Sequence, residues 1–204
     1  LQHADVPAQI SSTVVLVPPT TRVGQSVRKG QLLVELDNVD YMQEVIRAEL
    51  SLASAKSEQA ILDVEREAAE ERAALAMQDQ TLSEAELKRV TDAFNRGVAK
   101  QREVDHAQQK TIATSSVAVN AREAANRFPS REEQSSSAIS TKMAELTLAQ
   151  ENLRRCKVLS PIDGVLQEID VRVGEHVING KRIARVVNSG IMEIPLRLPS
   201  YARS

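Results

Sequence analysis

Aromatic residues are nearly absent from this sequence: they make up 2% of its 204 residues, and tryptophan does not occur. Aromatic rings fill much of the core in most globular enzymes, because each ring buries a large apolar area. The apolar content of 42% comes mostly from Ala, Leu and Val, and it stands beside many Glu, Gln, Arg and Ser residues. This composition is typical of long helices rather than of a thick core.

Other absences narrow the class of protein further. Cys156 is the single cysteine, so no internal disulfide can form. No apolar run approaches the roughly 20 residues that span a bilayer, and no signal peptide or lipid-attachment motif is present. The net charge is −2, with acids and bases interspersed and no basic patch, so nucleic acid is not an expected partner. The chain stops inside a predicted strand near Leu198, which suggests a fragment of a longer protein.

A short motif is present twice, about 150 residues apart. Residues 22–36 read RVGQSVRKGQLLVEL, and residues 172–186 read RVGEHVINGKRIARV. The same alignment places Val15-Leu16 opposite Val165-Leu166. We therefore predict two copies of a small β unit, over residues 13–37 and 159–188.

Glycines punctuate both copies, and they suit tight turns because glycine tolerates a positive φ. The predicted structural turns are at Gly24, Gly30, Gly164, Gly174 and Gly180. The copies disagree at one place, since residues 18–21 (Pro-Pro-Thr-Thr) have no match in residues 168–171. Either this strand is irregular or a short segment is missing there.

Two long helical runs fill the interval between the copies. No Pro or Gly occurs in residues 40–96, and a mostly apolar heptad series begins there with Val45 at position a and Ala48 at position d. A second series covers roughly residues 101–157. Heptads sustained over this length predict a coiled coil.

The two runs have nearly equal length and meet at residues 97–100, which predicts an antiparallel helical hairpin over residues 38–158. At 1.5 Å per residue each arm would be about 85 Å long. Pro129 is expected to kink or interrupt the second arm, because proline removes a donor and clashes with the preceding turn.

Paired glycine-punctuated β units that bracket a helical hairpin resemble the membrane fusion proteins, which are also called periplasmic adaptor subunits. The matching stretches are residues 23–37 with Tyr41, and residues 153–177. Within the second stretch Ser160 replaces the Ala of the family's usual Ala-Pro-x-Asp-Gly segment. The resemblance implies an α+β fold in which a long antiparallel coiled-coil hairpin is inserted into a split lipoyl/biotinyl-like β-sandwich. It also implies that residues 1–12 belong to a truncated β-barrel and that residues 189–204 begin that barrel again.

The hairpin tip also resembles that family. Its members often have Arg, then Leu four residues later, Gly eight later and Ser or Thr eleven later, followed by Glu and Asp. The corresponding residues here are Arg89, Ala93, Gly97, Lys100, Glu103 and Asp105, of which Ala93 and Lys100 depart from the pattern. The candidate partner-binding residues at the tip are Arg89, Phe94, Arg96, Gly97, Lys100 and Arg102. A merely solvated turn is the alternative interpretation.

The resemblance implies a periplasmic adaptor that is not an enzyme and that needs no cofactor or metal. It would link an inner-membrane transporter of the RND or ABC type to a TolC-like outer-membrane channel, for export of small molecules, metal ions or proteins. It would associate with the inner membrane of a Gram-negative bacterium, and it would self-associate into a ring, either a trimer or a hexamer.

Two other functions remain open. A lipoyl- or biotinyl-type carrier with a coiled-coil insertion would need a modified lysine in a tripeptide such as Met-Lys-Met or Asp-Lys-Ala, and neither tripeptide occurs. A structural coiled-coil scaffold would not account for the duplicated β unit.

No catalytic constellation is visible in the sequence. His3, His106 and His176 lie in different predicted elements, and we expect surface histidines. The four methionines, Met42, Met77, Met143 and Met192, are scattered, which favours helix packing over metal binding. Cys156 falls on the a/d face of the second heptad series, the predicted seam between the two helices, where a buried, unreactive thiol is expected.

Overall fold

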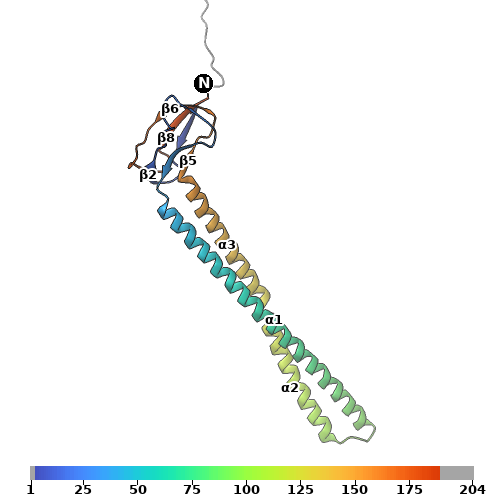
Figure 1. Cartoon of the computed structure of the whole chain (residues 1–204). Coiled ribbons are helices and arrows are strands. Elements are labelled where there is room, and N and C mark those ends of the chain that lie inside the picture. Colours follow the sequence, from blue (N-terminus) through green and yellow to red (C-terminus); the bar gives the residue numbers. More distant parts are fainter. Residues whose placement is uncertain (1–2, 189–204) are drawn as a thin grey trace, which may run out of the picture. The chain divides into compact units, whose positions relative to one another are not determined.

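The computed structural model describes residues 3–188, as eight strands and three helices in that range (Figure 1). The strands are β1 (His3–Pro7), β2 (Ser12–Leu16), β3 (Ser26–Val27), β4 (Leu32–Leu36), β5 (Lys157–Leu159), β6 (Gly164–Ile169), β7 (His176–Val177) and β8 (Arg182–Val187). The helices are α1 (Val39–Asn95), α2 (Gln101–Ala125) and α3 (Phe128–Arg155). The predicted return of a β-barrel at residues 189–204 lies outside the described residues. No helix within residues 3–188 is long and apolar enough to cross a membrane.

The chain divides into two compact units. One unit combines residues 1–49 with residues 145–204 and contains all the strands, and the other unit is the hairpin segment of residues 50–144. The split β unit predicted from the repeat is therefore one structural unit, and the helical insert forms a second.

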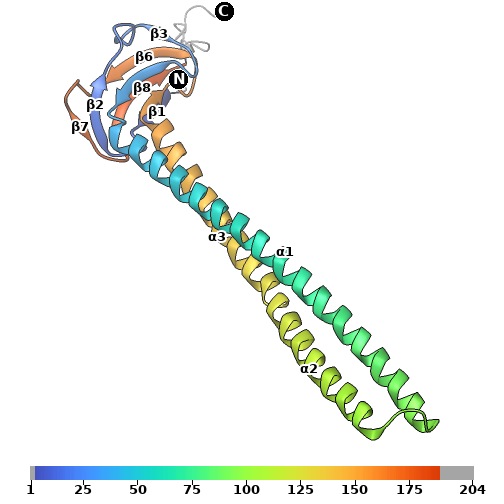
Figure 2. The same ribbon diagram turned by 60° about the horizontal axis from the view of Figure 1, so that its bottom comes forward.

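Two four-stranded antiparallel sheets form the β unit, in the orders β1-β8-β6-β3 and β5-β4-β2-β7 (Figure 2). Both sheets combine strands from the two sequence copies, because β3 pairs with β6 and β2 pairs with β7. Neither copy could therefore form its sheets alone. The inward-facing side chains of both copies build one apolar core, in which the largest fully buried residues are Leu33, Leu36, Leu166 and Ile183.

Strand β1 corrects the expected assignment of residues 1–12 to a separate β-barrel. It runs antiparallel to β8, from His3 opposite Val187 to Pro7 opposite Arg182, and Val6 is buried in the core of the sandwich. The physical reason is that β8 would otherwise present a row of unpaired backbone groups.

Backbone hydrogen bonds correct the alignment of the two copies. The Gly24 N–H donates to the Leu166 carbonyl at 2.7 Å, and the Gly174 N–H donates to the Val14 carbonyl at 2.8 Å. Val14 is therefore the structural equivalent of Leu166, and the expected match of Val15-Leu16 with Val165-Leu166 is wrong.

The first copy is longer than the second between this strand and the Arg-Val-Gly turn. The additional residues form an irregular turn in which the Thr21 N–H donates to the Pro18 carbonyl at 2.8 Å. An irregular strand, rather than a missing segment, accounts for the mismatch at residues 18–21.

The heptad prediction for the helices is confirmed by their buried residues. Every buried residue within α1, α2 and α3 occupies a predicted a or d position: Leu52, Leu62, Ala76, Ser83, Ala107, Ala118, Phe128 and Ala149. Small residues dominate this seam and allow close helix packing. The seam also contains a hydroxyl cluster, in which Ser83 Oγ lies 2.6 Å from Thr114 Oγ1 and Thr111 Oγ1 donates to the Ser83 carbonyl at 3.2 Å.

The interruption predicted at Pro129 is confirmed. Helix α2 ends at Ala125, α3 begins at Phe128, and Pro129 therefore lies in the first turn of α3, where a missing N–H costs nothing. Phe128 is buried beside the break, and the Arg131 guanidinium lies 5.3 Å from the centre of its ring. Arg131 also pairs with Glu65 of α1 at 3.2 Å, so both helices are tied together at this point.

Candidate functional site: the hairpin tip

The tip begins where α1 ends, and a Schellman motif determines that end. The Val98 N–H donates to the Ala93 carbonyl at 3.0 Å, and the Gly97 N–H donates to the Phe94 carbonyl at 2.8 Å. Gly97 has a φ of +78°, a conformation that glycine adopts without the steric cost of a Cβ. The sequence therefore ends α1 sharply, with its last carbonyl groups hydrogen-bonded to backbone N–H groups of the turn.

The second arm starts at once after this turn. The Lys100 N–H donates to the carboxylate of Glu103 at 3.2 Å, and Glu103 lies in the first turn of α2. A carboxylate at this place satisfies an otherwise free backbone donor and complements the positive end of the helix dipole. Both ends of the tip are thus stabilised locally.

The predicted partner-binding residues lie between the last turns of α1 and the first turn of α2, and all six are solvent-exposed. Arg89 is engaged within its own helix, since its guanidinium contacts the Glu86 carboxylate at 2.6 Å and lowers the pKa of that carboxyl group. Arg96 donates from Nε to the Asp92 carbonyl at 3.2 Å. Within the described residues no acceptor engages the side chains of Lys100 or Arg102.

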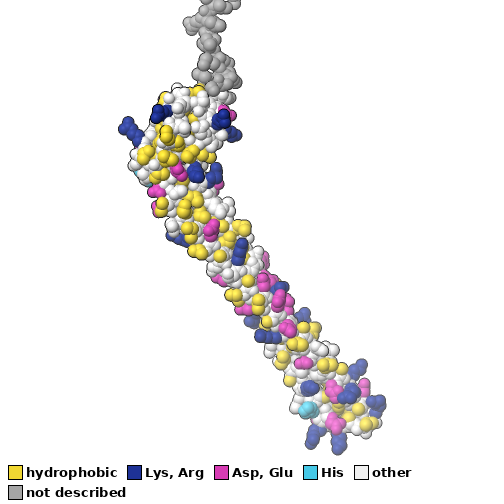
Figure 3. Space-filling model, viewed as in Figure 1, with side chains coloured by type: hydrophobic (Ala, Val, Ile, Leu, Met, Phe, Trp, Pro, Cys, Tyr) yellow, Lys and Arg dark blue, Asp and Glu magenta, His cyan; other side chains and the backbone are white. Residues whose placement is uncertain are grey.

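The sequence interpretation missed the most exposed apolar side chain of the tip. Val98 is 82% exposed and Phe94 is 38% exposed, so two apolar side chains project from a predominantly basic turn. The exposure of Val98 could have been predicted, because this residue lies beyond the last heptad position and follows the glycine that ends α1. Figure 3 shows apolar side chains interspersed with charged ones along the visible face of the hairpin.

Four of the five glycines predicted at structural turns adopt positive φ, namely Gly24, Gly30, Gly174 and Gly180. Gly164 differs from them, because it is the first residue of β6 rather than part of a turn. A Cβ at this position would lie 2.2 Å from the Val187 carbonyl oxygen. Close packing of backbone against backbone, rather than turn conformation, requires glycine there.

Cys156 is buried, as the seam predicted, at the junction of α3 and β5. Burial, followed by the nearby Asp37 carboxylate, raises the pKa of its thiol to about 11. The reactive thiolate is therefore scarce near neutral pH.

The histidines occupy β1, α2 and β7, and no group of potential metal ligands forms among the described residues. The place where a carrier domain would display its lysine is also altered. Strand β4 ends at Leu36 and α1 begins at Val39, so helix takes the place of a carrier's turn.

This architecture defines a class of protein: a lipoyl-type sandwich, split by an inserted helical hairpin. The family described as "RND MFP, barrel-sandwich hybrid domain" matches residues 2–189. The chain belongs to this family of membrane fusion proteins.

The chain is similar to several solved structures, of which MacA supports the fold. MacA from Actinobacillus actinomycetemcomitans is 19% identical, with a TM-score of 0.54, over 90% of this chain and 48% of that chain. The periplasmic adaptor protein EmrA is 16% identical, with a TM-score of 0.47, over 92% of this chain and 72% of that chain. The soluble domain of LipC, a membrane fusion protein of a type I secretion system, is 13% identical, with a TM-score of 0.48, over 92% of this chain and all of that chain. No curated protein sequence matches the chain. The chain spans about half the length of MacA.

Proposed function

We propose that this chain is the hairpin-bearing part of a periplasmic adaptor, which links an inner-membrane transporter of the RND or ABC type to a TolC-like outer-membrane channel. The observation that carries the proposal is the tip, where a hydrogen-bonded turn presents Phe94 and Val98 among Arg96, Lys100 and Arg102. Exposed apolar side chains with flanking cations are suited to docking on a protein surface. Membership of the membrane fusion protein family supports this assignment.

The tip would contact the channel through Val98 and Phe94, with Lys100 and Arg102 setting orientation and encounter rate through their charge. Arg89 contributes less in this scheme, because its guanidinium is already bound to Glu86. The adaptor would act as a ring of identical copies, a trimer or a hexamer, associated with the inner membrane. Small molecules, metal ions and proteins remain the candidate cargoes.

Crosslinking in cells tests the docking surface. A cysteine introduced as Val98→Cys and labelled with a photoactivatable maleimide should form a crosslink with an outer-membrane channel, identified by mass spectrometry of the adduct. The native Cys156 does not compete, because it is buried and its pKa is raised to about 11. The matched control is Leu50→Cys, which is 67% exposed on α1 but lies far from the tip along the helix.

Transport provides the second readout. The double charge reversal Lys100→Glu/Arg102→Glu should leave the folded protein intact and abolish both the crosslink and export. A crosslink from residue 50 but none from residue 98, together with normal export by the charge-reversed protein, would reject the tip as the docking site.

A further inference from the structure

A cleft opens between the edges of the two sheets, where β1 and β5 are the outer strands. Its volume is about 330 Å³, at the lower end of the range for small-molecule pockets. Four cationic side chains line it: Lys29, Arg154, Arg155 and Lys157. Asp5 is the only carboxylate among its lining residues, so the walls carry a net positive charge.

The single carboxylate of the cleft is already paired with an arginine that does not line the cleft. Asp5 accepts a hydrogen bond from Arg185 at 2.7 Å, and this contact lowers the pKa of the Asp5 carboxyl group. Arg154 is likewise engaged, since it pairs with Glu151 at 2.5 Å. The charge that remains uncompensated in the cleft belongs to the other three cations.

Arg155 is the most unusual of these three. Its Nη1 reaches Asn152 Oδ1 only at 3.5 Å, and its Nε is buried without any hydrogen-bond partner in the described chain. A buried guanidinium donor that has lost water and gained no acceptor is costly. Arg155 lines the cleft and is only partly buried, so an oxyanion there would contact the accessible part of its side chain rather than the buried Nε.

Lys29 and Lys157 complete the set. Lys157 faces Glu35 across the β4–β5 pair, but the two side chains form no ion pair within residues 3–188. Lysine on an edge strand such as β5 also discourages pairing with other chains, which would explain Lys157 alone. It does not explain why Lys29 and Arg155 line the same cleft.

The internal duplication provides a natural control for the role of these cations. The Gly30 N–H donates to the Ser160 carbonyl at 2.8 Å, and the Gly180 N–H donates to the Ala8 carbonyl at 2.8 Å, so the two copies share this backbone arrangement. In the second turn Asn179 stands where the first has Lys29. On the strands, Lys157 lies opposite Glu35. The equivalent place in the other half of the sandwich is occupied by Asp5, which lies opposite Arg185. In the second copy the fold is therefore built without a cation at the places equivalent to Lys29 and Lys157.

We propose that this cleft is a binding site for a phosphate ester, held by Arg155, Lys157 and Lys29. A phosphate dianion matches several converging cations better than a carboxylate does, and arginine's fork of donors suits phosphate oxygens. The cleft volume leaves room for the phosphate group and a small substituent. This site does not depend on the channel-docking function proposed above, since every lining residue belongs to the β unit.

Titration of the chain with glycerol 3-phosphate tests the site, with calorimetry for affinity and amide NMR shifts for location. Saturable binding should shift the Gly30 and Ser160 amides, which line the cleft. The Arg155→Gln/Lys157→Gln double variant should bind at least about tenfold more weakly, because two charged contacts are lost. The matched control is Arg182→Gln, which removes a cation of the β unit outside the cleft.

The control should keep the wild-type affinity within about twofold. Equal weakening in the control and the double variant would show general charge attraction and would overturn the proposal. Absence of saturable shifts in the wild-type protein, or acetate binding as tightly as the phosphate ester, would overturn it as well. Thermal unfolding of each variant distinguishes loss of binding from loss of fold.

Vesicle co-sedimentation then identifies the source of the phosphate. Phosphatidic acid vesicles, compared with phosphatidylcholine vesicles, should retain the wild-type chain and release it on addition of glycerol 3-phosphate if the ligand is a lipid headgroup. Binding of the soluble ester without vesicle retention supports the same site with a soluble ligand. Vesicle retention that the double variant preserves would mean adhesion elsewhere on the surface and would contradict a lipid ligand at this cleft.

Discussion

The sandwich and the hairpin are stabilised in different ways, although one continuous helix, α1, contributes residues to both units. In the sandwich, Leu33, Leu36 and Leu166 are completely buried. In the hairpin the best-buried apolar side chain, Leu62, remains 6% exposed, and three of the other buried positions, Ala76, Ala107 and Ala118, hold only alanine. A sandwich gathers side chains from eight strands into one core, whereas two helices shield each other along a single stripe. The hairpin therefore spreads its stability over its length, and its individual contacts contribute less.

The strongest test of this contrast is truncation of one leucine in each unit. Leu166→Ala should lower the free energy of unfolding of the sandwich by about 3–4 kcal/mol, because its surroundings cannot collapse into the cavity. Leu62→Ala should cost only about 2 kcal/mol, because neighbouring helices and solvent can adjust. Chemical denaturation followed by circular dichroism gives both values. Equal losses would contradict the contrast.

The next test concerns the turns that close the sandwich. Gly174 has a φ of +86°, and nothing lies near the position of an added Cβ. Gly174→Val should therefore cost about 2 kcal/mol through backbone strain alone, and Gly174→Asn should cost less than about 1 kcal/mol, since Asn tolerates this conformation. Thermal unfolding of the two variants separates strain from crowding. Similar losses for Val and Asn would indicate that strain is not the cause.

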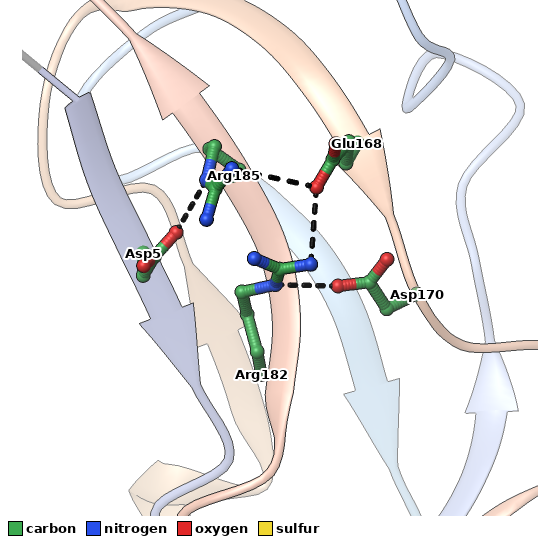
Figure 4. A network of polar contacts seen from close by, with 5 residues as sticks. All are labelled: Asp5, Glu168, Asp170, Arg182 and Arg185. Carbon is green, nitrogen blue, oxygen red and sulfur yellow. Dashed lines mark hydrogen bonds and ion pairs between the residues drawn. The ribbon is translucent and has the colours of Figure 1, made fainter.

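A smaller effect is expected at the ion pairs. In the hairpin, Glu65 and Arg131 form an exposed pair, and Arg131→Gln should cost about 0.5 kcal/mol, reduced further by salt. In the sandwich, Arg182 contacts Glu168 at 3.0 Å and Asp170 at 2.6 Å within the charged network of Figure 4. Arg182→Gln should lower the midpoint of thermal unfolding more than Arg131→Gln does, because it leaves Asp170 without its cation and Glu168 with only the longer contact to Arg185 at 3.8 Å. Melting curves at low and high salt compare the two; an identical, salt-independent shift would contradict the electrostatic explanation.

The last test is a pH response of the sandwich. The pKa of Cys156 rises from 9.0 to about 11 on folding, so the folded state holds the thiol proton more tightly. Its contribution to stability is complete below pH 9 and is lost as the pH rises towards 11. Cys156→Ala should remove this part of the alkaline loss of stability. Denaturation curves at pH 8 and pH 10.5 measure it, and an unchanged pH dependence would assign the loss to other groups.

Much of the architecture could be predicted from local patterns. The heptads identify the buried positions of the hairpin because helical periodicity places a and d residues on one face. Pro129 and Gly97 mark breaks because their backbone preferences act locally. The position of β1 could not be predicted in the same way, because pairing with β8 joins segments that are far apart in sequence. The equivalence of Val14 with Leu166 was missed because similar residues at Leu16 offered a competing alignment.

The sequence by itself therefore determined the two β copies, the helical insert, its seam and the exposed basic tip, all of which depend on periodicity or on special backbone residues. Only the tertiary structure decided that β1 pairs with β8 and that Lys29 and Arg155 line one cleft. It also decided that Arg89 pairs with Glu86 while Val98 is exposed. These features arise from contacts between distant segments, and the free energy of such contacts depends on geometry that no local pattern encodes.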